Sequence, residues 1–248
     1  MITTLLRNLV VCCVAGFSLA SVRAAIPIAH WIHPGGAQVY LVQSRTLPMV
    51  DVQIDFDAGS RRDPAGKAGL ASVTAAMAAR GVRASAAGAA LDENGLGQAW
   101  ADLGASFGAS ASSDRMGFSL RSLTDPELLP RVVALAARQL GDPAFPAEVW
   151  QREREQLAAS IRESDTRPAT VAGKAFAAAV YGDHPYGRRT TGTSLAAIGV
   201  EDMRGLYQRV IRPCRAKVSI VGDVSRAQAD ALVDGLFARL AAQPDTAS

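Results

Sequence analysis

The chain has 248 residues, of which 49% are hydrophobic and 20% are charged, enough apolar content for one large core or two small ones in a soluble globular protein. Its formal net charge is only +3, and its Lys and Arg residues form no cluster with interleaved aromatic side chains. Composition and charge therefore give no support to nucleic-acid binding, and no nucleic-acid partner is expected.

The N-terminal segment has the three parts of a secretory signal peptide. Arg7 supplies positive charge, residues 9–20 form a short apolar run, and residues 22–24 resemble a small-residue cleavage site. The run is shorter than the roughly 20 residues that span a bilayer. We therefore predict that residues 1–24 are removed from an exported protein, which is periplasmic in a Gram-negative cell and otherwise secreted. An uncleaved anchor is the alternative, and no later segment is long and apolar enough to span a membrane.

Removal of this segment changes the charge and the cysteine count. Arg7 and Arg23 lie within it and no acidic residue does, so 24 basic and 23 acidic residues remain, a formal charge of +1. Cys12 and Cys13 also leave, so the mature chain retains only Cys214 and forms no internal disulfide. Because no His lies near Cys214 in the sequence, we expect a buried structural thiol rather than a nucleophile.

Hydrophobic periodicity predicts the secondary structure of the mature chain. Residues 50–56 alternate apolar and polar side chains, which is typical of a strand with one face on a core. Leu70, Val73 and Met77 form a stripe at helical spacing, and Gly81 follows as a helix-ending residue. In chain order, the expected elements are strands 38–42 and 50–56, helices 69–80 and 91–103, strands 105–112 and 115–121, helices 126–140, 148–164, 168–181 and 201–210, strand 217–221, and helix 225–240.

The order of these elements indicates the fold class. Pairs of strands stand next to pairs of helices, without the regular alternation of a parallel βαβ sheet. This arrangement favours an α+β fold in which helices pack on a mainly antiparallel sheet. Residues 57–69 and 182–192 are expected to be loops, and the alanine-rich residues 84–90 are expected to form a flexible insertion.

Five short motifs follow one another along residues 36–240, and in this order they resemble the pitrilysin/insulinase family of zinc metallopeptidases. The resemblance implies a pitrilysin-type α/β roll in which residues 25–248 form a single domain, equivalent to the first domain of that family. We expect the family's second domain to be absent from this chain, which is a fragment or a naturally short form. The motifs are Leu-Pro-Met-Val with Ala-Gly-Ser-Arg (47–61), Pro-Ala-Gly-Lys-Ala-Gly-Leu-Ala (64–71), Asp-Pro-Ala-Phe with Gln-Arg-Glu-Arg-Glu (142–155), His-Pro-Tyr-Gly-Arg with Gly-Thr (184–193), and Leu-Tyr with Val-Gly-Asp-Val (206–224).

Active members of that family bind zinc through His-x-x-Glu-His on a helix, with a Glu on a later helix as the third protein ligand. This spacing places both imidazoles and the catalytic Glu on one helical face. By the resemblance, Ser72 and Ala76 stand at the two His positions, Ala75 at the Glu position and Ser160 at the third ligand. Glu153 matches an upstream acidic residue that lies near the metal in active members. The resemblance thus implies a member with no metal site, no other cofactor and no peptidase activity of its own.

Few other residues are candidates for chemistry. The sequence contains only three histidines, and His30 and His33 precede the first expected strand without a nearby Glu, so we expect a chance pair rather than a zinc site. His184 lies in the His-Pro-Tyr-Gly loop of the family, where a structural role is expected. Glu153 and Glu155 are interpreted as solvated charges on an arginine-rich helix.

Three functional hypotheses remain. The leading hypothesis is a non-catalytic subunit that pairs with an exported, active zinc peptidase of the same family and helps to form its peptide-binding chamber, with extended peptides as further partners. The second is a stand-alone binding or assembly protein without a peptidase partner. The third is an active zinc metalloendopeptidase with an unrecognised ligand set. A neighbouring gene for an intact His-x-x-Glu-His protein would favour the first hypothesis.

Overall fold

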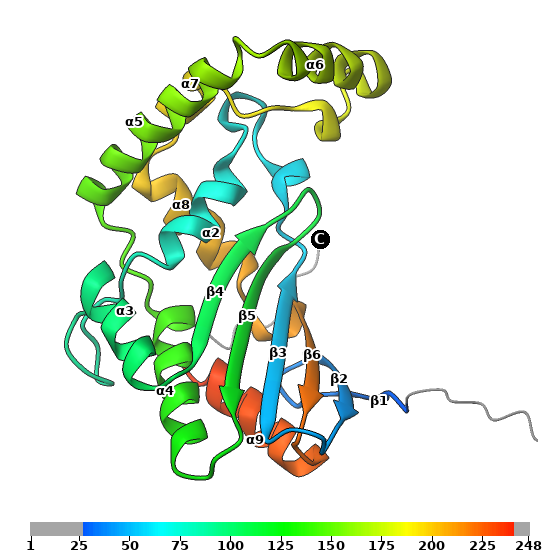
Figure 1. The fold of residues 1–248 in the computed structure, drawn as a ribbon, viewed down its shortest axis with the longest axis vertical. Coiled ribbons are helices and arrows are strands. Elements are labelled where there is room, and N and C mark those ends of the chain that lie inside the picture. Colours follow the sequence, from blue (N-terminus) through cyan, green and yellow to red (C-terminus); the bar gives the residue numbers. More distant parts are fainter. Residues whose placement is uncertain (1–26, 241–248) are drawn as a thin grey trace, which may run out of the picture.

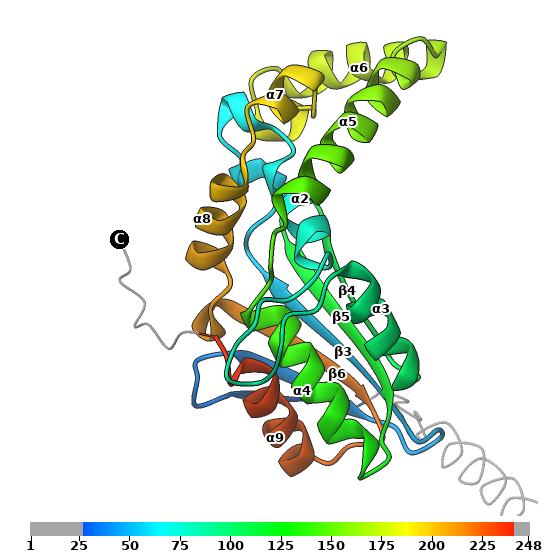
Figure 2. The same cartoon turned by 90° about the vertical axis from the view of Figure 1, so that its left-hand side faces the viewer.

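A computed structural model of the chain describes residues 27–240. The predicted signal peptide and its cleavage site lie outside these residues. Six strands form one sheet in the order β1-β2-β6-β3-β5-β4, and Figures 1 and 2 show helices gathered on one of its faces. No helix between residues 27 and 240 is long and apolar enough to cross a membrane.

The sheet is mainly antiparallel, as the sequence predicts for an α+β fold. Only β2 and β6 run parallel to each other. They are far apart in the sequence, and the stretch of chain that connects them contains three other strands and most of the helices. All five predicted strands are confirmed to within three residues at each end. The strands are β1 (Ala29–Ile32), β2 (Gln38–Gln43), β3 (Met49–Phe56), β4 (Ser106–Ala111), β5 (Met116–Leu123) and β6 (Ala216–Gly222).

Alternation along β3 explains how the sheet is oriented. Val50, Val52, Ile54 and Phe56 are buried beneath the helices, while the residues between them are partly exposed on the other face. The open face is held by polar contacts, since Arg121 of β5 donates to Asp51 of β3 at 2.6 Å. One apolar and one polar face is the pattern of a sheet that packs helices on one side only.

The predicted helices are likewise confirmed. Helix α2 lies against β4 and α8, and α4 packs on α9. Helices α5 and α6 extend beyond the end of the sheet (Figure 1). The helices are α2 (Leu70–Ala78), α3 (Glu93–Asp102), α4 (Leu128–Gly141), α5 (Ala147–Ser164), α6 (Pro168–Tyr181), α7 (Gly192–Ala196), α8 (Val200–Val210) and α9 (Arg226–Phe237), with 3-10 turns η1 (Ser60–Arg62), η2 (Ala65–Lys67), η3 (Pro185–Gly187) and η4 (Pro213–Arg215).

Two elements differ from the sequence prediction. His30 lies within strand β1 rather than before the first strand, because residues 29–32 pair with β2 at the edge of the sheet. Helix α7 was not expected, since its five residues are too short to show a helical period. It is instead fixed at its start by Thr191 and Ser194, whose side chains each accept from the other's backbone N–H.

Cys214 also differs from its prediction. The thiol is free, as expected, but it is only half-buried rather than buried. The residue lies in the short turn η4, next to the surface loop that contains Gly36. The 84–90 segment is an irregular loop closed by a bridge between Ser85 and Gly88, and its expected flexibility stays a prediction.

The centre of the core is aromatic and contains one buried hydroxyl. Tyr207 of α8 packs edge to face against Phe118 of β5 and Phe145, and all three are buried. The Tyr207 hydroxyl donates to the backbone carbonyl of Leu140 at 2.8 Å, which joins α8 to the last turn of α4. Complete burial raises the pKa of Tyr207, because the phenolate would lose its hydration.

We expect Tyr207→Phe to lower the free energy of unfolding by about 1–2 kcal/mol, because the buried Leu140 carbonyl loses its donor while the ring contacts remain. Urea unfolding followed by circular dichroism measures this change. Tyr40→Phe is the matched control, since the Tyr40 hydroxyl donates only to the neighbouring Gln38 side chain on the partly exposed face of β2. Equal effects of the two substitutions would contradict the structural role assigned to Tyr207.

Candidate functional site

The loop before α2 sets the direction of this helix. The Asp63 carboxylate, only 4% exposed, accepts the backbone N–H groups of Gly69 at 2.8 Å and Ala71 at 2.9 Å. These N–H groups belong to the first turn, where a helix lacks internal acceptors. Burial raises the pKa of the Asp63 carboxyl, and the backbone donors partly oppose this shift by stabilising its charge.

Gly69 makes this entry possible. Its backbone has a φ of 100°, a conformation that residues other than glycine rarely adopt. A Cβ added at this position would lie 2.6 Å from the Thr190 hydroxyl. The segment before and within α7 also contacts this loop. Arg188 donates to the Asp63 carbonyl at 3.1 Å, and the Ser194 hydroxyl donates to the Ala68 carbonyl at 2.8 Å. The 64–71 and 184–193 motifs, far apart in the sequence, therefore meet around the start of α2.

Helix α2 places the predicted motif positions on two different surfaces. Ser72 and Ala76, one turn apart, are both exposed and share one side of the helix. Ala75 is buried with the apolar stripe that faces the core. Ser160 is exposed on α5, so the four positions lie on two helices.

The side chains at these positions do not fit a zinc ion. Zinc in proteins is bound by thiolate, imidazole or carboxylate groups, and Ser72, Ala75, Ala76 and Ser160 offer only hydroxyl and methyl groups. Residues 27–240 contain no group of three or more His, Cys, Asp or Glu side chains that could hold a metal ion.

The three histidines have partners that orient them individually. Buried His33 accepts the Gly35 N–H through Nδ1 at 3.1 Å, while its Nε2 lies 3.2 Å from the Asp234 carboxylate. His30 stacks on Tyr40, with ring centroids 4.5 Å apart. In the His-Pro-Tyr-Gly loop, the His184 imidazole accepts the Tyr186 N–H at 3.2 Å and so closes its turn. The three rings thus serve local structure.

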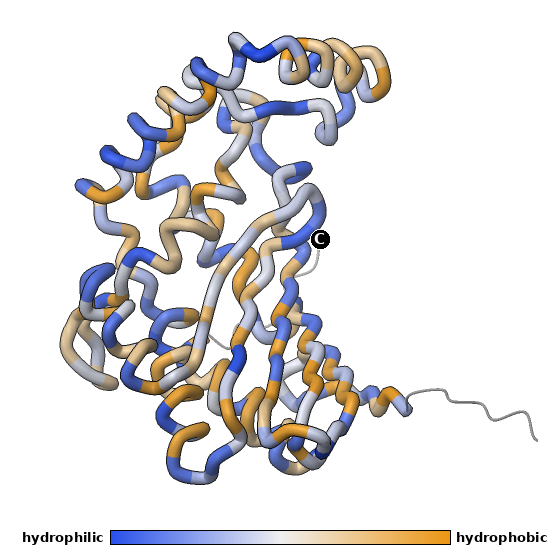
Figure 3. The backbone as a smooth tube through the Cα atoms, in the orientation of Figure 1, coloured by the Kyte–Doolittle hydropathy of each residue, from blue (hydrophilic) through white to orange (hydrophobic). Residues whose placement is uncertain are grey.

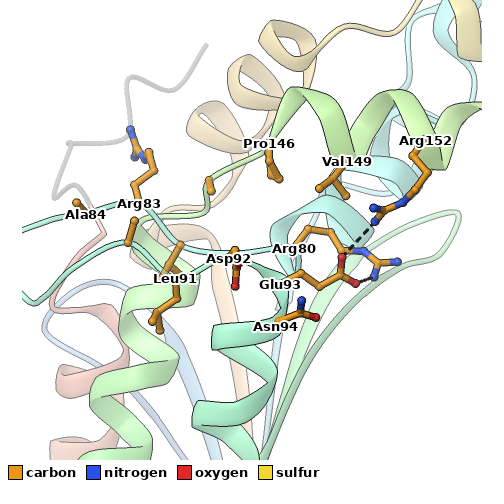
Figure 4. Close-up of a pocket in the computed structure, with 13 residues that line it drawn as sticks. Arg80, Arg83, Ala84, Leu91, Asp92, Glu93, Asn94, Pro146, Val149 and Arg152 are labelled. Carbon is orange, nitrogen blue, oxygen red and sulfur yellow. Dashed lines mark hydrogen bonds and ion pairs between the residues drawn. The ribbon is translucent and has the colours of Figure 1, made fainter.

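Four charged side chains join the end of α2 to α3 and α5. Arg80, which follows α2, pairs with Glu93 of α3 and with Glu153 of α5, the latter at 3.1 Å. Arg152 closes the cluster through Glu93 at 3.3 Å (Figure 4). Glu153 is therefore not the freely solvated charge expected from the sequence, whereas Glu155 is exposed. Sequence reasoning missed this cluster because Arg80 and Glu153 lie 73 positions apart and no local spacing links them.

This cluster borders an open pocket of about 790 Å³. Its wall combines Arg80, Glu93 and Arg152 with apolar side chains such as Leu91 and Val149 (Figure 4). Each Arg in the cluster is paired with a Glu, so the charges balance within the protein. Neither Ser72 nor Ala76 lines this pocket.

Comparisons with known proteins explain the motifs at α2. The model of the family described as insulinase, peptidase family M16, matches residues 38–194, more than half of the chain. The chain belongs to the insulinase family of peptidases, family M16. No curated protein sequence gives a significant match to it.

Solved structures of peptidases and of an inactive peptidase domain share the fold. The inactive domain of an M16 peptidase from Pseudomonas fluorescens matches 90% of this chain with 29% identity and a TM-score of 0.81. A protease from Helicobacter pylori matches 90% with 20% identity and a TM-score of 0.76, and the periplasmic protease PqqL from Escherichia coli matches 91% with 16% identity and a TM-score of 0.74. This chain spans 53%, 52% and 26% of these three chains respectively. The likeness confirms the predicted pitrilysin-like α+β fold.

We expect Asp63→Ala to lower the free energy of unfolding by about 1–3 kcal/mol, because the N–H groups of Gly69 and Ala71 lose a buried acceptor. Asp57→Ala is the control in the same loop. Asp57 is exposed and its pKa is lowered by contacts with Arg62 and Arg61, and such surface pairs contribute under about 1 kcal/mol. Chemical unfolding compares the two variants, and a smaller loss for Asp63→Ala than for Asp57→Ala would contradict this view of the α2 entry.

We also expect the purified mature chain to retain no stoichiometric zinc, because Ser72, Ala76 and Ser160 supply no zinc-binding group. The measurement is elemental analysis after exhaustive dialysis against metal-free buffer. One tightly held zinc ion per chain would contradict the expectation and would point to a ligand set outside these positions.

Proposed function

We propose that this M16 domain is non-catalytic and pairs with an active zinc peptidase of the same family. One observation carries the proposal: α2 keeps its structural support from the family motifs, yet presents Ser72 and Ala76 on its exposed side and Ala75 inside. The fold is retained while the groups that zinc chemistry requires are missing at the positions that the resemblance assigns. The likeness to the inactive M16 domain from Pseudomonas fluorescens supports the same proposal.

The proposed role is to complete a chamber that holds peptide substrates. Small side chains on the exposed side of α2 leave space without burying a charge. Strand β4 forms one edge of the sheet next to this helix, so its free backbone groups offer pairing to an extended peptide. The domain would thus hold substrate while the partner supplies the zinc and the catalytic Glu.

The proposed location is outside the cytoplasm, in the periplasm or secreted. The support is the signal-like sequence of residues 1–24. The structural likeness to the periplasmic protease PqqL agrees with this location.

The stand-alone binding or assembly protein remains the second candidate. It would use the same fold and the same peptide-accepting edge, but without a peptidase partner. An active zinc metalloendopeptidase would require ligands other than Ser72, Ala76 and Ser160. Chelator-sensitive cleavage of unfolded peptides by the chain alone would support that third candidate and overturn the non-catalytic proposal.

We expect the mature chain to co-elute with an exported M16 peptidase that carries an intact His-x-x-Glu-His motif and is encoded in the same genome. Co-expression followed by size-exclusion chromatography tests the complex, and a stable one should bury more than about 1,000 Å² in total. Peptide cleavage should require the intact peptidase and rise when this chain is present. If the two proteins never co-elute and the intact peptidase is fully active alone, the stand-alone alternative takes the place of this proposal.

A further inference from the structure

The open pocket of about 790 Å³ lies between the start of α3 and the first turns of α5 (Figure 4). Its volume is within the range of roughly 300–1,000 Å³ that is typical of ligand sites. Leu91 and Val149 supply apolar groups to its wall. Arg80, Arg83 and Arg152 supply positive charge. Figure 3 shows hydrophilic and hydrophobic residues alternating along α5, which forms one side of the pocket. The wall therefore suits a ligand that has both apolar and charged groups.

The two acidic residues of the pocket wall are engaged within the domain. The Asp92 carboxylate accepts the backbone N–H of Gly95 at 2.7 Å and so caps α3. The Glu93 carboxylate is shared between Arg80 and Arg152, with the second contact at 3.3 Å. Both carboxylates are thus already stabilised by donors of the protein itself.

Hydrogen-bond donors of the wall, by contrast, are left over. Arg83 is exposed, and its side chain makes no hydrogen bond or ion pair with another residue between 27 and 240. The Arg152 side chain is 55% exposed and contacts Glu93 and Glu153 through Nη2, at 3.3 and 3.9 Å. A guanidinium carries five N–H donors on three nitrogens, so most donors of Arg152 are unused. The spare capacity of the pocket is therefore cationic and suits carboxylate oxygens.

The two arginines with spare donors are separated by the apolar part of the wall. Figure 4 shows Arg83 and Arg152 at opposite ends of the pocket, with Leu91 and Val149 between them. A small carboxylic acid would reach only one of these ends. An extended chain that carries two carboxylates on either side of an apolar group matches the whole wall, because each of its groups meets a partner of the fitting kind.

We propose that this pocket binds an extended polypeptide segment in which two acidic side chains flank apolar ones. The carboxylates pair with Arg83 and Arg152, and the apolar side chains pack against Leu91 and Val149. Arg80, which also lines the pocket, follows Ala76 by four residues, close to one helical turn, so the exposed side of α2 leads toward the pocket. The binding needs only this domain, so it is independent of the pairing proposed above.

The test measures the fluorescence anisotropy of a fluorescein-labelled peptide, Ser-Glu-Leu-Val-Glu-Ser with an amidated C-terminus, titrated with the mature chain alone. A matched peptide with Lys in place of both Glu residues should bind at least about tenfold more weakly, because both ion pairs are lost. A second matched peptide, with Ser in place of Leu and Val, should also bind more weakly, because it loses the apolar contacts.

Variants of the chain locate the binding. Arg83→Ala and Arg152→Ala should each weaken binding of the acidic peptide by about fivefold, the effect of one partly exposed ion pair. Arg45→Ala is the control, since Arg45 is exposed in the β2–β3 loop and does not line the pocket. This variant removes the same charge and should bind within about twofold of the unchanged chain. Circular dichroism verifies that each variant is folded.

Each outcome decides for or against the pocket. Preference for the acidic peptide that is reduced by Arg83→Ala and Arg152→Ala, but not by Arg45→Ala, supports the proposal. Equal affinity for the Glu and Lys peptides, equal effects of the three substitutions, or no binding at all overturns it. Unchanged affinity for the peptide without Leu and Val indicates capture of carboxylates alone and overturns it as well. None of these results changes the co-elution expected with an M16 peptidase, so the two proposals fail separately.

Discussion

The start of α2 depends on one buried carboxylate. The Asp63 carboxylate accepts hydrogen bonds from two backbone N–H groups at the start of the helix, and the Asp63 carbonyl accepts one from Arg188. One residue thus links the loop between β3 and α2, the helix itself and the 184–193 segment. Gly69 allows the tight turn between them. Without these contacts, the helix would have no fixed entry angle, and neither its apolar stripe nor its exposed side would have a defined position.

This constraint explains how the chain can remain an M16 domain without zinc-binding side chains at α2. The family motifs around Asp63 and Gly69 serve the backbone, and their contacts are independent of the side chains at Ser72 and Ala76. A bound metal also ties together the elements that supply its ligands. In this chain, the ion pair between Arg80 and Glu153 joins the end of α2 to α5. The pair is partly exposed, so its contribution to stability is modest.

The fold also separates two surfaces by their chemistry. The open face of the sheet is polar, with Asp51 and Arg121 paired across neighbouring strands, whereas helix α6 exposes the apolar side chains of Val171, Phe176 and Val180. On the polar face, Asp51 pairs with Arg121 and Asp55 pairs with Arg115 within the chain. Among residues 27–240, these three side chains of α6 are more than half exposed. The two surfaces therefore differ in what they can contribute to an assembly.

The sequence by itself determined the strands and long helices, because periods of two and 3.6 residues are local properties. It also predicted the absence of a zinc site, since a sequence with three histidines and no His-x-x-Glu-His can be read without a structure. Strand β1 and helix α7 escaped prediction because a four-residue edge strand and a five-residue helix are too short for a period. Only the tertiary structure decided that Glu153 pairs with Arg80 and that Phe176 faces outward. Both depend on which segments meet in space, and an apolar helix reads the same in sequence whether its neighbours cover it or leave it exposed.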